Sequence, residues 1–212
     1  MIREKKSEKI PSSLLTTQRY DGEDVKTQLL EDQHNKCYIC ERRLGTDFQV
    51  EHLKSREGHN DLRQKWSNLF MACSYCNGKK SDLYDNNVCP IGTNVEDEIR
   101  QRIDFTQNKA SFTTTVDDEP HRNTVGMLLK LYNGKRNLRN IKETIFFNET
   151  KQEIINFSRK INNFLTNSTP ENRVLVANEL SIDKSMLGFK YWIICDNHLD
   201  NEFKDEIKWN KE

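Results

Sequence analysis

Cys37-Tyr38-Ile39-Cys40 and Cys73-Ser74-Tyr75-Cys76 are two C-x-x-C pairs, and 32 residues lie between them. Pairs at this spacing form two tight turns that can aim four thiolates at one tetrahedral zinc ion. Between the pairs lie Glu51-His52 and Asn68, and Asn77 directly follows the second pair. The sequence therefore predicts a structural zinc site, with Cys37, Cys40, Cys73 and Cys76 as ligands, that holds a segment rich in polar side chains.

Cysteine pairs of this kind also occur without zinc. A single C-x-x-C can be a thioredoxin-like redox pair, two unrelated buried thiols or part of a disulfide framework. The chain opens with charged residues that lead into no apolar signal segment, and no run approaches the ~18 apolar residues of a membrane span. We therefore expect a cytoplasmic protein without membrane contact, whose reduced thiols bind metal. Cys89 and Cys195 are expected to be small core residues.

The charges are balanced overall but unevenly placed. The 212 residues include 33 basic and 33 acidic ones, which is unusual for a free-standing nucleic-acid binder. Residues 120–142 contain six bases and no acid, whereas residues 171–212 contain six bases and nine acids. The basic run is either a solvated helix face or a surface that follows phosphates or docks to an acidic partner. We predict nucleic-acid contacts there from Lys135, Arg136 and Arg139.

The predicted fold class is α+β and mostly α. We expect three parts: a lead and helix over residues 1–35, a zinc-clasped module over 36–90, and a mainly helical recognition and partner-docking region over 91–212. Polar composition and a break at Pro11 predict a mobile or extended lead over residues 1–20. The expected elements are helices at 24–33, 77–83, 124–132, 141–165, 171–180 and 185–195, strands at 48–50 and 111–116, and a loop at 54–64.

The longest expected helix carries one broad apolar stripe, which we assign to the core. Its members are Ile141, Ile145, Ile154, Phe157, Ile161, Phe164 and Leu165.

The polar residues inside the zinc-clasped module suit phosphodiester hydrolysis. That reaction needs a base to deprotonate water and a cation to neutralise charge that develops on the phosphate and the leaving oxygen. His52 suits the base because its ordinary pKa near ~6.5 leaves it largely neutral at pH 7. Glu51 and the amide oxygen of Asn77 are hard donors for Mg²⁺. Asn68 is expected to hold the loop after His52 through hydrogen bonds to its backbone.

The pattern Cys37-x2-Cys40, Glu51-His52, Asn68 and Cys73-x2-Cys76-Asn77 resembles the HNH endonuclease family in its zinc-bearing form. The likeness covers residues 37–82. It implies a ββα-metal fold embedded in the helical body, a general base at His52, a central structural asparagine at Asn68, and Mg²⁺ or Mn²⁺ ligands at Glu51 and Asn77. Lys79-Lys80-Ser81 is similar to the family's closing segment, and we expect Lys79 and Lys80 to contact nucleic acid.

A narrower likeness is to PtuB-type nucleases of Septu and retron anti-phage systems. It is carried by residues 50–54 and 66–73, with further support from 123–125, 131–134 and 188–194. It implies a DNA-cleaving defence effector that works beside an ATPase of the SMC/ABC kind, PtuA, which holds the nuclease in check. One departure is that residues 53–56 contain no proline after the Glu-His step.

Two alternatives stay open. A zinc ribbon without catalysis would bind nucleic acid or a protein through the basic run, but such a module has no need for the Glu51-His52 pair. An RNase would use the same groups, because they address phosphate and not sugar.

Overall fold

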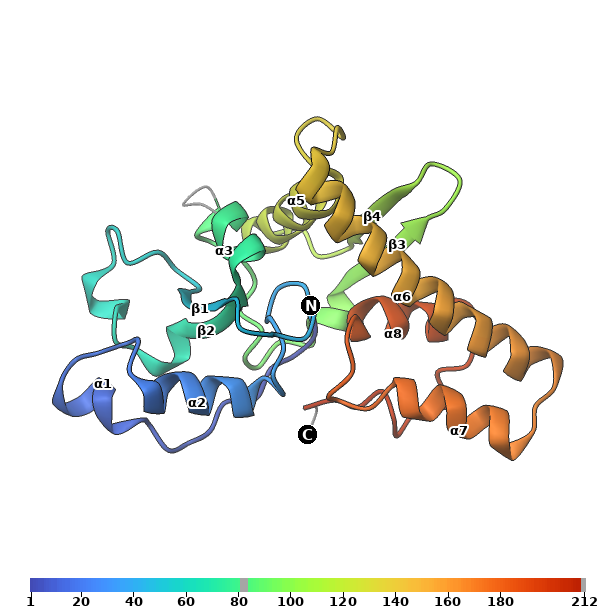
Figure 1. Ribbon diagram of the computed structural model, residues 1–212, viewed down its shortest axis with the longest axis horizontal. Helices are drawn as coiled ribbons and strands as arrows, with labels where there is room; N and C mark the ends of the chain where they lie inside the picture. The colour runs from blue at the N-terminus through green and yellow to red at the C-terminus, as the bar shows by residue number, and fades with distance from the viewer. Residues whose placement is uncertain (81–83, 211–212) are drawn as a thin grey trace.

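The structure is a computed structural model that describes residues 1–80 and 84–210. Figure 1 shows helices α1 (Ser12–Thr16) and α2 (Glu23–Asp32) beside a small β-hairpin on one side, and the long C-terminal helices on the other. The predicted class, α+β and mostly α, is confirmed. Among the described residues, no helix is both long enough and apolar enough to cross a bilayer.

The first hairpin positions the polar residues of the zinc-clasped module. Strand β1 (Phe48–His52) pairs antiparallel with β2 (Leu69–Cys73), with His52 opposite Leu69 and Phe48 opposite Cys73. All five residues of β2 are buried, because α2 covers one of its faces and the main core the other. The predicted strand over 48–50 is confirmed and extends to include Glu51 and His52. A helix, α3 (Ser74–Lys80), follows β2 directly.

The expected helix at 77–83 begins three residues earlier than predicted, and its last residues, 81–83, lie outside the described part. Two short 3₁₀ turns, η1 (Asn60–Leu62) and η2 (Trp66–Asn68), lie in the connection between β1 and β2. The expected loop over 54–64 is otherwise irregular.

The helical body contains a second hairpin. Strands β3 (Ile99–Asp104) and β4 (Lys109–Thr114) form this hairpin. The helices of the body are α4 (Val95–Glu98), α5 (Glu119–Asn133), α6 (Ile141–Thr166), α7 (Pro170–Glu179) and α8 (Leu187–Asp196). The Asp118 side chain caps α5, and Asn140 with Glu143 forms a capping box on α6. Strand β3 was not predicted, because its alternating polar residues gain strand structure only through pairing with β4.

The apolar stripe predicted for α6 is wrong at both ends. Ile141, Ile145 and Leu165 are 78%, 54% and 47% exposed, whereas Phe146 and Phe147 are buried. Phe146 stacks on Tyr75 with ring centres 4.3 Å apart and also contacts Tyr132 at 4.9 Å. Because the two aromatic side chains bury more apolar area than the isoleucines, they set which face of the first turns points inward.

The lead, expected to be mobile or extended, forms only an isolated bridge between Glu4 and Ile91 before α1, but it is packed against the rest of the chain and not mobile. Met1 and Ile2 are 2% and 0% exposed, and the Glu4 amide donates a 2.9 Å hydrogen bond to the Pro90 carbonyl. The Lys6 ammonium lies 3.8 Å from the centre of the Trp66 ring. The lead is therefore bound across the zinc-clasped module and the body.

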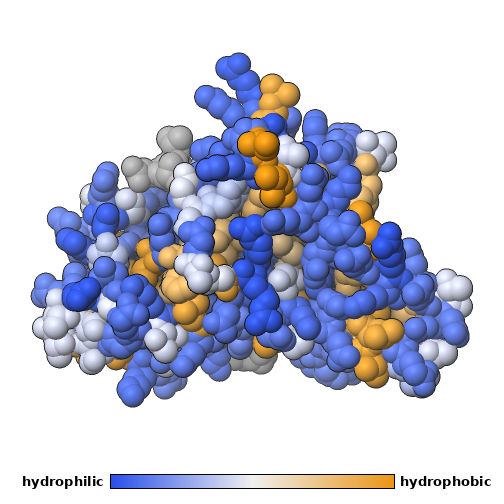
Figure 2. All heavy atoms as spheres, in the orientation of Figure 1, coloured by the Kyte–Doolittle hydropathy of each residue, from blue (hydrophilic) through white to orange (hydrophobic). Residues whose placement is uncertain are grey.

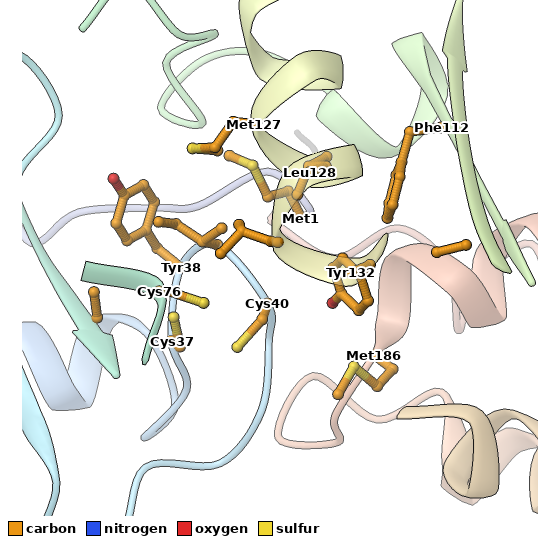
Figure 3. Packing of buried hydrophobic residues seen from close by; sticks show 14 of the residues in the cluster. Met1, Cys37, Tyr38, Cys40, Cys76, Phe112, Met127, Leu128, Tyr132 and Met186 are labelled. Carbon is orange, nitrogen blue, oxygen red and sulfur yellow. The ribbon is translucent and has the colours of Figure 1, made fainter. Parts of the chain in front are cut away.

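One core joins the module to the helical body. Figure 3 shows Cys37, Cys40 and Cys76 beside Met1, Tyr132 and Met186 in this cluster. Tyr132 of α5 contacts Phe112 of β4 and Phe189 of α8, with ring centres 5.2 and 5.5 Å apart. The cysteine turns thus pack against α5 and α8 and do not form a separate domain. Cys89 and Cys195 are half-buried free thiols.

Candidate active site

The four paired cysteines form a metal-ready cluster. Their sulfur atoms all lie within 4.8 Å of one another, and the Cys40 and Cys73 sulfurs are 3.9 Å apart. Four bonds of ~2.3 Å to one tetrahedral zinc ion place the sulfurs about 3.8 Å apart, so this donor set fits zinc. All four are buried free thiols, and no disulfide joins them. The predicted clustering is confirmed.

Glu41 fixes the first cysteine turn to the body. Its backbone takes the left-handed conformation with φ 58°, which closes the turn after Cys40. Its buried carboxylate lies 2.7 Å from the Met1 amino nitrogen and accepts a 3.1 Å hydrogen bond from the Gly188 amide of α8. Burial alone would raise the pKa of Glu41, but the Met1 amino group and Lys36 outweigh it and lower the pKa. The turn is therefore held by an ionised carboxylate inside the core.

His52 lies at the end of β1 with 7% of its surface exposed. Its Nε2 atom is 3.0 Å from the Arg63 carbonyl oxygen. A carbonyl only accepts, so this contact assigns the proton to Nε2 and leaves the Nδ1 lone pair able to take a proton. Burial lowers the pKa of His52, and the contact with the carbonyl opposes that effect. The imidazole is therefore neutral at pH 7, as a general base requires.

Asn68 ties together the two ends of the loop after β1. Its amide nitrogen donates to the carbonyls of Lys54 at 3.0 Å and Leu62 at 3.2 Å, and its amide oxygen accepts from the Lys54 amide at 2.9 Å. This loop carries the Arg63 carbonyl that holds His52. Asn68, itself only 5% exposed, thus joins two parts of the loop that carries this carbonyl.

Glu51 lines the same pocket as His52 and is paired with a lysine. The Lys80 ammonium lies 2.8 Å from a Glu51 carboxylate oxygen and donates a 2.9 Å hydrogen bond to the His52 carbonyl. Burial raises the pKa of Glu51, and the charge of Lys80 opposes this. The amide nitrogen of Asn77, on α3, donates to the Gln49 side chain.

A pocket of about 510 Å³ brings these groups together. Glu51, His52, Asn77 and Lys80 line it. Further lining residues come from the segment before β1 and from the loop after it, namely Tyr20, Asp21, Lys26, Ser55 and Arg56. A carboxylate, an amide and a neutral imidazole that face one polar pocket can bind a divalent cation and deprotonate a water.

Residues 37–83 match the family model described as HNH endonuclease. This segment is therefore similar to HNH endonuclease domains. The chain is also 39% identical over 70 residues to the Septu protein PtuB of Bacillus thuringiensis. That match covers 32% of this chain and 27% of PtuB, so it spans little more than a quarter of the relative's length. No solved structure matches the chain. Both resemblances noted from the sequence are confirmed.

The basic residues predicted to contact nucleic acid lie in different environments. Of that set only Lys80 lines the pocket around His52, and it is 3% exposed. Lys79 forms an ion pair with Glu143. The Arg139 guanidinium donates to the carbonyls of Tyr132 and Asn108 and lies 3.5 Å from the Phe147 ring centre.

Lys135 and Arg136 are exposed on the turn after α5. The pocket residues missed from the sequence include Tyr20, Asp21, Lys26, Ser55 and Arg56. Arg56 carried a usable signal, because it is a basic residue in the loop directly after the Glu-His step. Tyr20 carried none.

Proposed function

We propose that this protein is a metal-dependent endonuclease that hydrolyses phosphodiester bonds in DNA, with His52 as the general base. The observation that carries the proposal is the contact between His52 Nε2 and the Arg63 carbonyl at 3.0 Å, which leaves Nδ1 as the proton acceptor of an imidazole that lines one pocket with Glu51 and Asn77. Asn68 supports this geometry as a positioning residue, since it fixes the loop that bears Arg63.

Glu51 and Asn77 would hold the catalytic cation, Mg²⁺ or Mn²⁺. A carboxylate and an amide oxygen are hard donors that such ions prefer, and both side chains line the pocket. The bound ion would neutralise charge on the phosphate and on the leaving oxygen. The four cysteines would hold zinc in a structural role, because all four positions are occupied by sulfur and buried.

The similarity to the Septu protein PtuB supports a role as the nuclease effector of an anti-phage system. We propose that the protein works there with an ATPase partner of the PtuA type. An exposed corner of the helical body is the candidate docking surface. It combines the cations Lys135 and Arg136 with three apolar side chains: Leu138, Ile141 and Ile145 are 76%, 78% and 54% exposed.

Figure 2 shows apolar side chains at this corner, above the junction of α5 and α6. A surface that only follows phosphates needs cations and no large aliphatic side chains, whereas protein interfaces bury an apolar centre inside a polar rim. The corner therefore fits an acidic protein surface with an apolar centre better than it fits DNA.

The decisive experiment compares His52→Ala with the parent on plasmid DNA and on RNA of the same sequence, with Mg²⁺ or Mn²⁺. We expect DNA cleavage to fall by roughly 10²–10⁴-fold while folding and zinc content stay unchanged. His59→Ala is the matched control, because His59 lies in the loop after β1, its side chain is 45% accessible, and it does not line the pocket. If His52→Ala cleaves as fast as the parent, the assigned base is wrong. Cleavage of RNA alone contradicts the DNA substrate, and binding without cleavage of either supports the non-catalytic zinc ribbon.

A further inference from the structure

The turn between α1 and α2 reaches the nuclease pocket from outside the HNH domain. Tyr20 lies in this turn, half-buried, and lines the pocket. The centre of its ring is 4.8 Å from the centre of the His52 imidazole, and the two rings are inclined by 66°. Edge contacts of this kind restrict the orientation of both rings. Tyr20 thus packs directly against the proposed general base.

The Tyr20 hydroxyl holds an arginine at the pocket. It accepts a hydrogen bond from the Arg56 guanidinium. The guanidinium carbons of Arg56 and Arg63 lie 5.6 and 5.7 Å from the centre of the Tyr20 ring, within the range of cation–π attraction. Arg56 is otherwise exposed and lines the pocket. A guanidinium held in this way presents its remaining donors to a phosphate with less loss of side-chain entropy.

The position of Tyr20 is determined by the fold. The Asp24 carboxylate accepts hydrogen bonds from the Ser13 amide at 2.9 Å and the Ser12 hydroxyl at 3.1 Å, which clamps α1 to α2 on either side of the turn. The Gln64 side chain donates to the Gln18 carbonyl at 3.0 Å and so joins the turn to the loop after β1. Leu14 of α1 and Val25 of α2 are buried in one cluster with the hairpin.

We propose that Tyr20 is a positioning residue of the nuclease site with two separable actions. Its ring restrains the His52 imidazole, and its hydroxyl holds Arg56 where the guanidinium binds a phosphate of the substrate strand. The kinetic part of this inference rests on the proposed function. Tyr20 precedes residues 37–83, so the match to the HNH family model does not include it.

Two substitutions separate the two actions. Tyr20→Phe keeps the ring and removes the hydroxyl, so KM for DNA should rise about 3–10-fold while kcat stays within about twofold of the parent. Arg56→Gln should raise KM at least as much, and adding Tyr20→Phe to it should have no further effect. Tyr20→Leu removes both contacts, so kcat should also fall about 10–100-fold. Phe105→Leu is the control, since Phe105 is an exposed aromatic residue on the β3–β4 turn, 46% accessible.

A second readout does not depend on cleavage. In protein with isotope-labelled histidine, the His52 ring resonances, assigned by their loss in His52→Ala, should move in Tyr20→Leu and stay close to the parent in Tyr20→Phe and Phe105→Leu. If Tyr20→Leu fails to fold, the comparison of Tyr20→Phe, Arg56→Gln and their double variant still decides the hydroxyl action. Parent-like kinetics and resonances in Tyr20→Leu would overturn the inference while leaving the nuclease proposal intact. An active His52→Ala would instead remove the nuclease proposal.

Discussion

The ammonium group of Lys80 lies 2.8 Å from a carboxylate oxygen of Glu51, and the two side chains are 4% and 14% exposed. Taking both charges out of water costs free energy, so each depends on the other for compensation. The lysine thus neutralises the carboxylate that we propose as a ligand of the catalytic cation. A divalent ion that binds Glu51 must share it with this ammonium or displace it.

Lys80→Met should therefore lower the stability of the metal-free protein and raise its affinity for a divalent cation. Loss of one partner of a buried pair leaves the other uncompensated, which costs about 2–4 kcal/mol. A divalent cation can then supply the missing charge, so affinity for Mn²⁺ should rise about 3–10-fold. Thermal unfolding with and without Mn²⁺ and calorimetric titration measure both effects. Lys79→Met is the control, because Lys79 pairs with Glu143. Unchanged Mn²⁺ affinity in Lys80→Met would contradict this prediction.

Asn68→Ala should loosen the loop after β1 and slow cleavage without loss of zinc. It removes three hydrogen bonds that Asn68 makes with the backbone of Lys54 and Leu62. The stability lost should be about 1–3 kcal/mol, because the buried backbone groups lose their partners. Hydrogen exchange should become faster at the Lys54 amide. Slow exchange there, together with parent-like kcat, would show that Asn68 does not position His52.

Replacement of a clustered cysteine should remove the structural metal. We expect about one zinc ion per chain in the purified parent, and its loss together with lower solubility in Cys37→Ser or Cys73→Ser. Cys195→Ser is the control, as this half-buried thiol lies outside the cluster. Elemental analysis measures the zinc content of each protein. A parent protein without zinc would refute the assignment of the four cysteines as zinc ligands.

The exposed corner and Arg139 should respond differently to mutation. Charge reversal of Lys135 and Arg136 should leave the fold intact and reduce co-purification with an ATPase partner, because both residues are exposed. Arg139→Glu should instead lower the melting temperature, since its guanidinium is hydrogen-bonded to the Tyr132 carbonyl at 2.6 Å and to Asn133 at 2.9 Å. An unchanged pull-down after the double reversal would exclude this corner as the docking surface.

Stability should fall in acid partly through Glu179. Burial alone would raise its pKa, but hydrogen bonds from Lys160 and Lys190 outweigh burial and lower the pKa from 4.5 to about 2. Because the folded pKa lies below the unfolded one, the stabilisation is present above pH 4.5 and is lost as the pH falls towards 2. At pH 7 Glu179→Gln should cost about 1–3 kcal/mol.

Chemical denaturation at several pH values should show this difference between parent and Glu179→Gln shrinking below about pH 4.5 and disappearing near pH 2. Glu202→Gln, in an exposed pair with Arg173, should show a smaller difference at every pH. A difference between parent and Glu179→Gln that does not vary with pH would refute the assignment.

Local sequence patterns are sufficient to predict the parts of the site that depend on local geometry. The cysteine pairs, the strand that carries Glu51 and His52, and the helix that carries Asn77 lie within one hairpin and its adjoining turns. Turn-forming C-x-x-C spacing and alternation along a strand act over a few residues, so they can be recognised without knowledge of distant contacts. The capped helices of the body could be predicted for the same reason, to within one residue of the ends of α6 and α7 and within five of the start of α5.

Tertiary structure alone decided which side chains are buried, paired or available. Lys80 follows the motif like an ordinary basic residue, and only the packing of α3 against β1 makes it the partner of Glu51. Arg139 belongs to a basic run, yet contacts with Asn108 and Phe147 occupy it. Tyr20 contacts His52, which lies 32 residues later in the sequence, because α1 and α2 pack on the hairpin. Such contacts are set by the simultaneous packing of distant segments, and no local pattern encodes them.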